Sequence, residues 1–384
     1  MKNDKTLELY IHIPFCERKC RYCDFLSFPA GEDTKDAYVR QLIEEIRVQA
    51  KQYEDYNVSS IFIGGGTPSI LKGVQIINIM SAVFEAWKID AGAEITIECN
   101  PGTLTKEKLE AYNVADINRI SLGLQSANDK ELASLGRIHT FSDFLLSYEM
   151  VRQVGFNNVN VDIMSTLPGQ TLQSYKDTLR KVAMLKPEHI SAYSLIIEEG
   201  TPFYDLYQIE SFKNSIPDED TDREMYHMTA FELAKSGYKR YEISNYAKPG
   251  YECRHNTGYW IGTNYLGLGL GASSYIMNRR FRVESDMGKY LMIDMHRDIT
   301  PLYQELKELS KEELMSEFMI LGLRLTDGVS GAEFNERFGL NMFDKYKDAI
   351  RKNNNIGLLD VQEPVIKLTE KGLDLANFVM KDFI

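Results

Sequence analysis

Three cysteines near the start of the chain form a Cys-x3-Cys-x2-Cys run, at Cys16, Cys20 and Cys23. They directly follow an apolar segment, residues 9–15, of the kind that forms a buried strand. Three thiolates this close in sequence can wrap one iron–sulfur cluster, whereas a four-iron cluster has four corners to ligate. The run therefore predicts a [4Fe-4S] cluster with one iron left open for chemistry.

A zinc site is the alternative for these thiolates, because three cysteines and one histidine are a common structural zinc set and His12 is near in sequence. Zinc ligands usually come as two short pairs separated by a longer loop. Here one tight group has no second pair nearby, and Cys99 and Cys253 are isolated. The spacing favours the iron–sulfur interpretation.

The composition is that of an ordinary globular protein, with 384 residues, 43% hydrophobic and 26% charged. The net charge of −12 argues against nucleic acid as a partner, since phosphate backbones attract clustered Lys and Arg. The first residues lack the apolar stretch of a secretory signal, and no run approaches the roughly 18 apolar residues of a spanning helix. The odd number of cysteines makes a disulfide framework unlikely and fits a reducing compartment, so we expect a cytoplasmic protein.

Short apolar runs alternate with stretches of helical period from residue 7 to about residue 275, which predicts βα units around a parallel sheet. Tyr38, Leu42 and Ile46 mark one helical face. The expected strands are residues 7–13, 60–63, 94–98, 119–124, 158–163 and 189–195. Six such units favour an α/β fold with a partial (β/α)6, TIM-like barrel, whose site lies at the carboxyl ends of the strands.

The alternation stops after this region. We expect a core at residues 1–275, a linker at 276–299, and a C-terminal winged-helix-like domain at 300–384, built of helices, a hairpin and a last helix. This last domain holds more acidic than basic residues, so it is expected to pack or dock rather than to bind DNA.

The cysteine run on the loop after the first strand resembles the signature of the radical S-adenosylmethionine (SAM) enzymes. That resemblance implies a [4Fe-4S] cluster whose fourth iron is ligated by the methionine moiety of SAM. It also implies an electron donor to the cluster and cleavage of SAM to a 5′-deoxyadenosyl radical, which is chemistry of the cofactor. The protein's task is then to hold the nucleoside and exclude water.

Further residues match, in order, the coproporphyrinogen-oxidase-like branch of this family. The glycine-rich turn after the second strand resembles the motif that grips the methionine amino group, and other matching residues are implied to contact the nucleoside, the carboxylate, the sulfonium or the adenine. The implied SAM-binding residues are Tyr10, Tyr22, Gly65, Gly66, Thr67, Glu98, Gln125, Arg137 and Asp162. No residue is assigned as catalytic.

Two functions occur in this branch, oxygen-independent coproporphyrinogen III oxidation and haem chaperoning. The oxidases carry a fourth cysteine two positions after the third, where this chain has Phe25. The segment His255-Asn-Thr-Gly-Tyr259-Trp260 resembles the His-Asn-x-x-Tyr-Trp motif of the chaperones. Imidazole is a common axial ligand of haem iron and aromatic rings offer a porphyrin an apolar face. We therefore expect haem as cargo, with His255 as ligand of its iron and Tyr259 and Trp260 in contact with it.

The resemblance further implies that haem is delivered to respiratory haem proteins, with contact at the membrane periphery made through partners. The alternative function is the oxidase reaction, and the same fold could support either.

Overall fold

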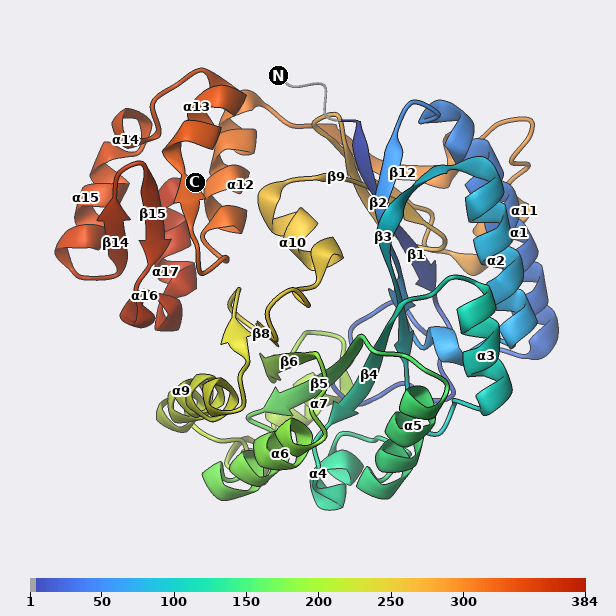
Figure 1. Cartoon of the computed structure of the whole chain (residues 1–384), viewed down its shortest axis with the longest axis horizontal. Coiled ribbons are helices and arrows are strands. Elements are labelled where there is room, and N and C mark those ends of the chain that lie inside the picture. The colour runs from blue at the N-terminus through green and yellow to red at the C-terminus, as the bar shows by residue number, and fades with distance from the viewer. Residues whose placement is uncertain (1–4) are drawn as a thin grey trace.

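The computed structural model describes residues 5–384 and places twelve strands in one continuous sheet. Seven neighbouring strands in the middle of the sheet run parallel, in the order β9-β1-β2-β3-β4-β5-β6 (Figure 1). Their bounds are β1 (Thr6–Ile13), β2 (Asn57–Gly65), β3 (Lys88–Cys99), β4 (Arg119–Gln125), β5 (Val159–Ser165), β6 (His189–Ser194) and β9 (Asn264–Leu268). The six predicted strands and the partial barrel are confirmed.

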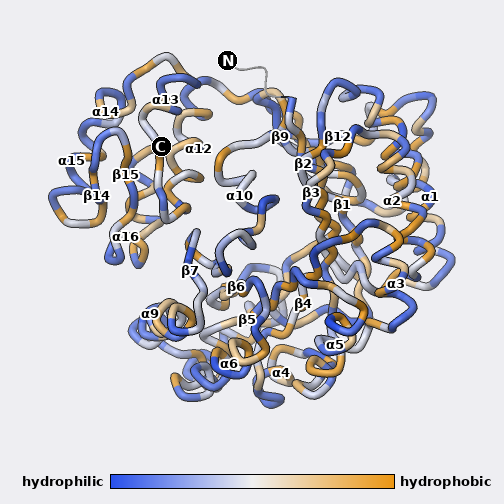
Figure 2. Tube along the Cα trace, in the orientation of Figure 1, coloured by the Kyte–Doolittle hydropathy of each residue, from blue (hydrophilic) through white to orange (hydrophobic). Residues whose placement is uncertain are grey.

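Helices cover the outer face of this sheet, and side chains at helical spacing pack against it. Tyr38, Leu42 and Ile46 of the first helix are fully buried, as their period predicts. Figure 2 shows hydrophobic residues concentrated in the strands and in the inner faces of the helices. The helices of the core are α1 (Glu32–Gln52), α2 (Gly73–Ala86), α3 (Lys106–Val114), α4 (Asp129–Ser134), α5 (Phe141–Gln153), α6 (Leu172–Met184), α7 (Pro202–Tyr207), α8 (Glu210–Lys213), α9 (Glu219–Lys235), α10 (Arg254–Ile261) and α11 (Met287–Met292).

The sheet extends beyond the parallel strands at both edges through antiparallel strands. These are β7 (Lys239–Arg240) and β8 (Asn245–Ala247) on one side, and β10 (Ser273–Ile276), β11 (Arg279–Val283) and β12 (Tyr303–Glu308) on the other. The stretch expected to be a linker, residues 276–299, therefore holds a strand and a helix of the core, and β12 lies within the expected small domain. These strands were not predicted because they contain many charged residues. Strands near a sheet edge tolerate Arg, Lys and Glu.

The remaining chain forms a smaller unit with its own hydrophobic core, which includes Met319, Phe334 and Ile366. Its three-stranded sheet has the order β13-β15-β14, and the β14–β15 hairpin is the predicted wing-like element. The elements are α12 (Lys311–Gly322), β13 (Val329–Ser330), α13 (Gly331–Phe338), α14 (Met342–Lys345), α15 (Lys347–Asn355), β14 (Leu359–Gln362), β15 (Val365–Leu368), α16 (Glu370–Asp374) and α17 (Ala376–Met380).

Helix α10 lies between this small unit and the core sheet (Figure 1). Arg324, which follows α12, joins the two sides: its guanidinium stacks 4.2 Å from the centre of the Trp260 ring and its Nη2 lies 3.6 Å from Oε2 of Glu242. The Glu242 side chain is completely buried. Because a buried carboxylate without a cation is costly, Arg324 fixes how the small unit sits on α10.

Replacing Arg324 should therefore weaken the whole protein. We expect Arg324→Leu to lower the free energy of unfolding by about 3 kcal/mol, since Glu242 would stay buried without its partner. Urea unfolding followed by circular dichroism measures the change. Arg351→Leu is the control, because its pair with Asp348 is exposed and such pairs contribute roughly 0–1 kcal/mol. Equal losses in the two variants would contradict the role given to Arg324.

Candidate functional site

The three cysteines lie on the loop between β1 and α1, and main-chain hydrogen bonds hold that loop in place. The amide of Cys16 donates to the carbonyl of Phe28 at 3.1 Å, and the amide of Arg21 donates to the carbonyl of Leu135 at 3.0 Å. All three cysteines have free thiols and line one cavity of about 390 Å³. The loop therefore places three cysteines on the wall of a single cavity.

The glycine-rich turn after β2 lies directly against this loop. The amide of Gly66 donates to the carbonyl of Ile13 at 2.9 Å, and that of Thr67 donates to the carbonyl of Phe15 at 2.7 Å. A Cβ atom at Gly66 would come within 2.7 Å of the Phe15 carbonyl oxygen, so only glycine allows this approach. The Thr67 hydroxyl lies 3.5 Å from the sulfur of Cys16. The two motifs thus form one continuous wall of the cavity.

Polar side chains from the ends of β3 and β4 and from the loop after α4 close the cavity. Glu98 accepts a hydrogen bond from the amide of Gly65 at 3.0 Å. Arg137 donates to Asn100 at 3.0 Å, and its buried Nε has no hydrogen-bond partner. Gln125 sits at a register shift between β4 and β5 with φ of 71°, a local distortion of the kind that redirects a side chain.

The cavity brings together most of the residues predicted to bind the cluster and SAM: Cys16, Cys20, Cys23, Tyr22, Gly65, Gly66, Thr67, Glu98, Gln125, Arg137 and Asp162. Asp162 lies within β5 rather than at its end, because the strand runs on to Ser165. Tyr10 is the exception. It is absent from this wall and instead bonds to His12 and lines the two neighbouring cavities. Its predicted place beside the sulfonium remains a prediction.

Burial dominates the electrostatics of this cavity. Desolvation, reinforced by the charge of Asp162, raises the pKa of Glu98 to about 8, and desolvation also raises the pKa of Asp162. The thiol of Cys23 likewise has a raised pKa because it is partly buried. At neutral pH Glu98 is therefore largely protonated. Because a neutral Glu98 does not attract the Arg137 guanidinium, that guanidinium is available to an incoming carboxylate.

A second and a third cavity adjoin the first and share residues of its wall. The middle one, about 220 Å³, shares Glu98 and Asp162 with the cysteine cavity and is also lined by His255. The outer one, about 510 Å³, shares Tyr10 and Tyr259 with the middle one. Phe25 lines all three and is 62% exposed. We call these the cysteine cavity, the middle cavity and the outer cavity.

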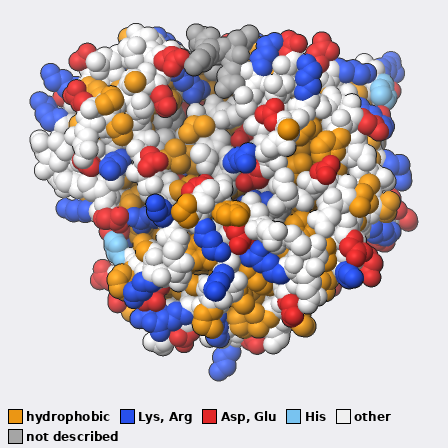
Figure 3. All heavy atoms as spheres, in the orientation of Figure 1, with side chains coloured by type: hydrophobic (Ala, Val, Ile, Leu, Met, Phe, Trp, Pro, Cys, Tyr) orange, Lys and Arg blue, Asp and Glu red, His pale blue; other side chains and the backbone are white. Residues whose placement is uncertain are grey.

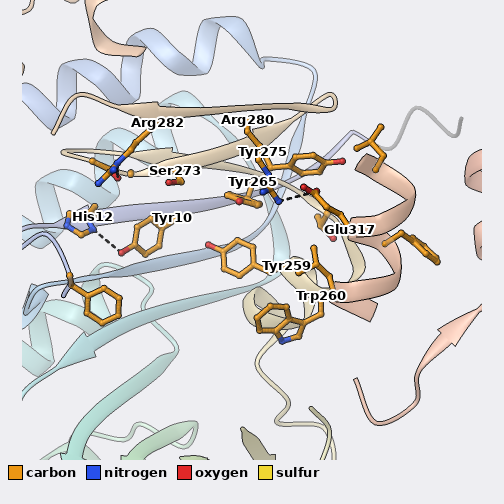
Figure 4. A pocket seen from close by; sticks show the side chains of 18 of the residues that line it. Tyr10, His12, Tyr259, Trp260, Tyr265, Ser273, Tyr275, Arg280, Arg282 and Glu317 are labelled. Carbon is orange, nitrogen blue, oxygen red and sulfur yellow. Dashed lines mark hydrogen bonds and ion pairs between the residues drawn. The ribbon is translucent and has the colours of Figure 1, made fainter. Parts of the chain in front are cut away.

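The 255–260 segment forms α10, and its two ends have different environments. The His255 ring is 1% exposed, with Nδ1 bonded to Ser60 at 2.8 Å and Nε2 bonded to Tyr259 at 2.9 Å. Burial, with the nearby Arg119 charge, lowers the pKa of His255 to about 3, so the ring is neutral. Tyr259 and Trp260, in contrast, line the outer cavity (Figure 4). Ligation of haem iron by His255 stays a prediction, and it requires that one of these two hydrogen bonds open.

Several residues of the outer cavity were not predicted from the sequence. Besides Tyr259 and Trp260, its wall includes aromatic rings and cations from β9, β10, β11 and the small unit: Tyr265, Tyr275, Arg280, Arg282, Phe318 and Arg337. Arg280 and Arg282 fall in the expected linker. The alternation of basic and apolar residues along residues 280–283 is the sequence signal that could have identified this strand.

Comparison with known proteins agrees with this architecture. Residues 10–182 match the radical SAM superfamily and residues 309–375 match the HemN C-terminal domain. The chain is 36% identical to the heme chaperone HemW of Lactococcus lactis over 99% of this chain and 98% of the relative. It is 35% identical to HemW of Bacillus subtilis over 98% of each chain. The solved coproporphyrinogen III oxidase HemN of Escherichia coli superposes with a TM-score of 0.86 and 25% identity, covering 98% of this chain and 89% of that one.

The fold and the cysteine cavity thus define a radical SAM protein. Within that superfamily, the chain belongs to the HemW family. Membership implies a [4Fe-4S] cluster and SAM, and the cysteine cavity fits both. Cys16, Cys20 and Cys23 would supply the thiolates, and the unpartnered Nε of buried Arg137 suits a carboxylate. When bound, these groups supply reductive cleavage of SAM.

Glu98 gives a prediction about pH. A carboxyl with a folded-state pKa of about 8 and an ordinary value of 4.5 stabilises the fold fully below pH 4.5, and this contribution is lost as the pH rises through 8. We expect the unfolding free energy of the SAM-free protein to fall between pH 5 and pH 8 more steeply than that of Glu98→Gln, by about 1 kcal/mol per pH unit. Parallel slopes in urea unfolding would show that Glu98 is ionised in the folded protein.

Proposed function

We propose that this protein is a haem chaperone, which binds haem and passes it to haem proteins while retaining a [4Fe-4S] cluster and SAM. The observation that carries the proposal is the outer cavity, where Tyr259 and Trp260 of the 255–260 segment line a space of about 510 Å³ that shares Phe25 with the cysteine cavity. Support also comes from the relatives, which are named heme chaperones and align over nearly the whole chain.

The chemistry of the outer cavity suits a flat apolar ligand. Tyr259 packs edge-on against Tyr265, with ring centres 4.6 Å apart, and Tyr265 lies 6.2 Å from Tyr275 (Figure 4). Aromatic rings that face a cavity offer dispersion contacts to a macrocycle. Phe25 stands between this space and the cysteines, at the position where the oxidases of the branch carry a fourth cysteine. A ligand held in the outer cavity lies beside the cluster site, because the two cavities share Phe25 but not the cysteines.

Partners and location belong to the same proposal. We infer delivery to respiratory haem proteins, an electron donor for the cluster, and residence in the cytoplasm with contact to membrane-bound clients through protein partners. Five free cysteines fit a reducing compartment. Within residues 5–384, no helix is long and apolar enough to cross a membrane. Acidic and basic side chains are mixed across the face shown in Figure 3, which favours protein clients over nucleic acid.

Anaerobic reconstitution tests the proposed function directly. We expect the reconstituted protein to bind one haem in an absorbance titration, and to convert no coproporphyrinogen III to protoporphyrinogen IX with reductant and SAM. Turnover at enzymatic rates would instead assign the alternative, coproporphyrinogen oxidation. If the reconstituted protein bound no haem, that result would contradict the proposal of a haem chaperone.

His255 and Tyr259 form a matched pair for testing iron ligation. If haem binding frees Nε2 of His255 from the Tyr259 hydroxyl, His255→Ala should weaken haem binding about tenfold and change the Soret band and the magnetic circular dichroism spectrum. Tyr259→Phe keeps the ring and removes the competing hydrogen bond, so haem affinity should be kept or increased. An unchanged haem spectrum in His255→Ala would leave His255 a purely structural residue of α10.

A further inference from the structure

Two arginines of β11 face the outer cavity side by side. Arg280 and Arg282 line the cavity, whereas Phe281 between them is buried in the core. Residues two apart in a strand point to the same face and lie about 7 Å apart along it. Figure 4 shows Arg280 descending from this strand toward Tyr265 and Arg282 descending toward His12. The cavity therefore combines an aromatic wall with a pair of cations at one edge.

The two guanidinium groups differ in their partners. Nη2 of Arg280 pairs with Oε2 of Glu317, in helix α12 of the small unit, at 3.1 Å. Arg282 donates from Nε to the carbonyl of Gly271 at 3.1 Å, and within residues 5–384 its two terminal nitrogens have no hydrogen-bond or carboxylate partner. One cation is thus available to a ligand, and the other is held by a carboxylate that a ligand could replace.

Haem has the complementary chemistry, because two propionate carboxylates project from neighbouring rings along one edge of an apolar macrocycle. Resting on the proposed function, we propose that Arg282 and Arg280 bind the two propionates of haem and so fix which edge of the porphyrin faces β11. Arginine suits this task, since its planar fork of donors binds carboxylates in a defined geometry. The aromatic rings then contact the apolar part of the macrocycle.

Glu317 gives this site a second property. For Arg280 to bind a propionate it must leave Glu317, and that pair connects β11 of the core with α12 of the small unit. Glu317 is partly desolvated, which raises its pKa, so the loss of its cation has a cost that the contact between Arg280 and the propionate must exceed. Binding of haem and the contact between the two units are therefore in competition for Arg280.

The experiment compares ferric haem with its dimethyl ester, in which both propionates are masked, as ligands of the anaerobically reconstituted full chain. We expect the wild-type protein to bind haem about tenfold or more tightly than the ester. Arg282→Ala and Arg280→Ala should each lose about tenfold in haem affinity with little change for the ester. Glu317→Gln should tighten haem binding and leave the ester unaffected, because it frees Arg280.

Arg279→Ala is the matched control. Arg279 is on the same strand, carries the same charge and pairs with exposed Glu308, but it does not line the cavity. Arg282→Lys, which keeps the charge, should retain part of the preference for haem over its ester. Equal binding of haem and ester by the wild type, or equal losses for both ligands in Arg282→Ala, would overturn the propionate site alone. Binding of neither ligand by the wild type would overturn the proposed function and this site with it.

Discussion

The site depends on how closely the end of β2 approaches the loop that follows β1. Two main-chain hydrogen bonds join these two segments, from the amide of Gly66 to the carbonyl of Ile13 and from the amide of Thr67 to the carbonyl of Phe15. Parallel pairing of β1 with β2 sets the register, and the absence of a side chain at Gly66 lets the backbones meet. Because of this contact, the thiols and the glycine-rich turn form one wall, and the strands that follow need only add polar side chains at the same edge.

A second constraint is the contact between α10 and the polar side chains of Ser60 and Glu8 beneath it, which we call the polar layer. This contact positions the aromatic residues of the outer cavity. His255 bonds to Ser60 on β2, and a Cβ atom at Gly258 would overlap the carboxylate of Glu8 on β1. Burial raises the pKa of Glu8 to about 8, so this carboxyl is largely neutral at pH 7 and can lie beneath the helix. Within the 255–260 segment, His255 and Gly258 hold the helix against the sheet, and Tyr259 and Trp260 line the outer cavity, with the Tyr259 hydroxyl bonded to His255.

Most of the core was predictable from the sequence, and the reasons for the exceptions are physical. A central strand such as β4 is buried on both faces and carries an apolar residue at every second position (Ile120, Leu122, Leu124), whereas β11 is near a sheet edge, where arginines are tolerated. Chain order placed the cysteine loop and Glu98 together, because parallel strands end at the same edge. It could not show that Tyr10 bonds to His12 within β1, or that His255 already bonds to Tyr259 of its own helix and to Ser60 of β2, since these bonds depend on side-chain rotamers and, for Ser60, on a distant part of the chain.

An open iron alone does not decide between a reaction and a delivery task, because the same cavity for cluster and SAM serves both. What distinguishes the two is how a porphyrin can be placed relative to that cavity. In this chain Phe25 lines both the cysteine cavity and the outer cavity, and none of the three cysteines lines the outer cavity, where the aromatic rings and the arginines of β11 lie. Oxidation of a propionate by radical SAM chemistry requires that propionate to reach the cysteine cavity. A porphyrin held by the residues of the outer cavity stays outside that space, so the placement of these residues, rather than the cysteine motif, argues for carriage of the porphyrin over its oxidation.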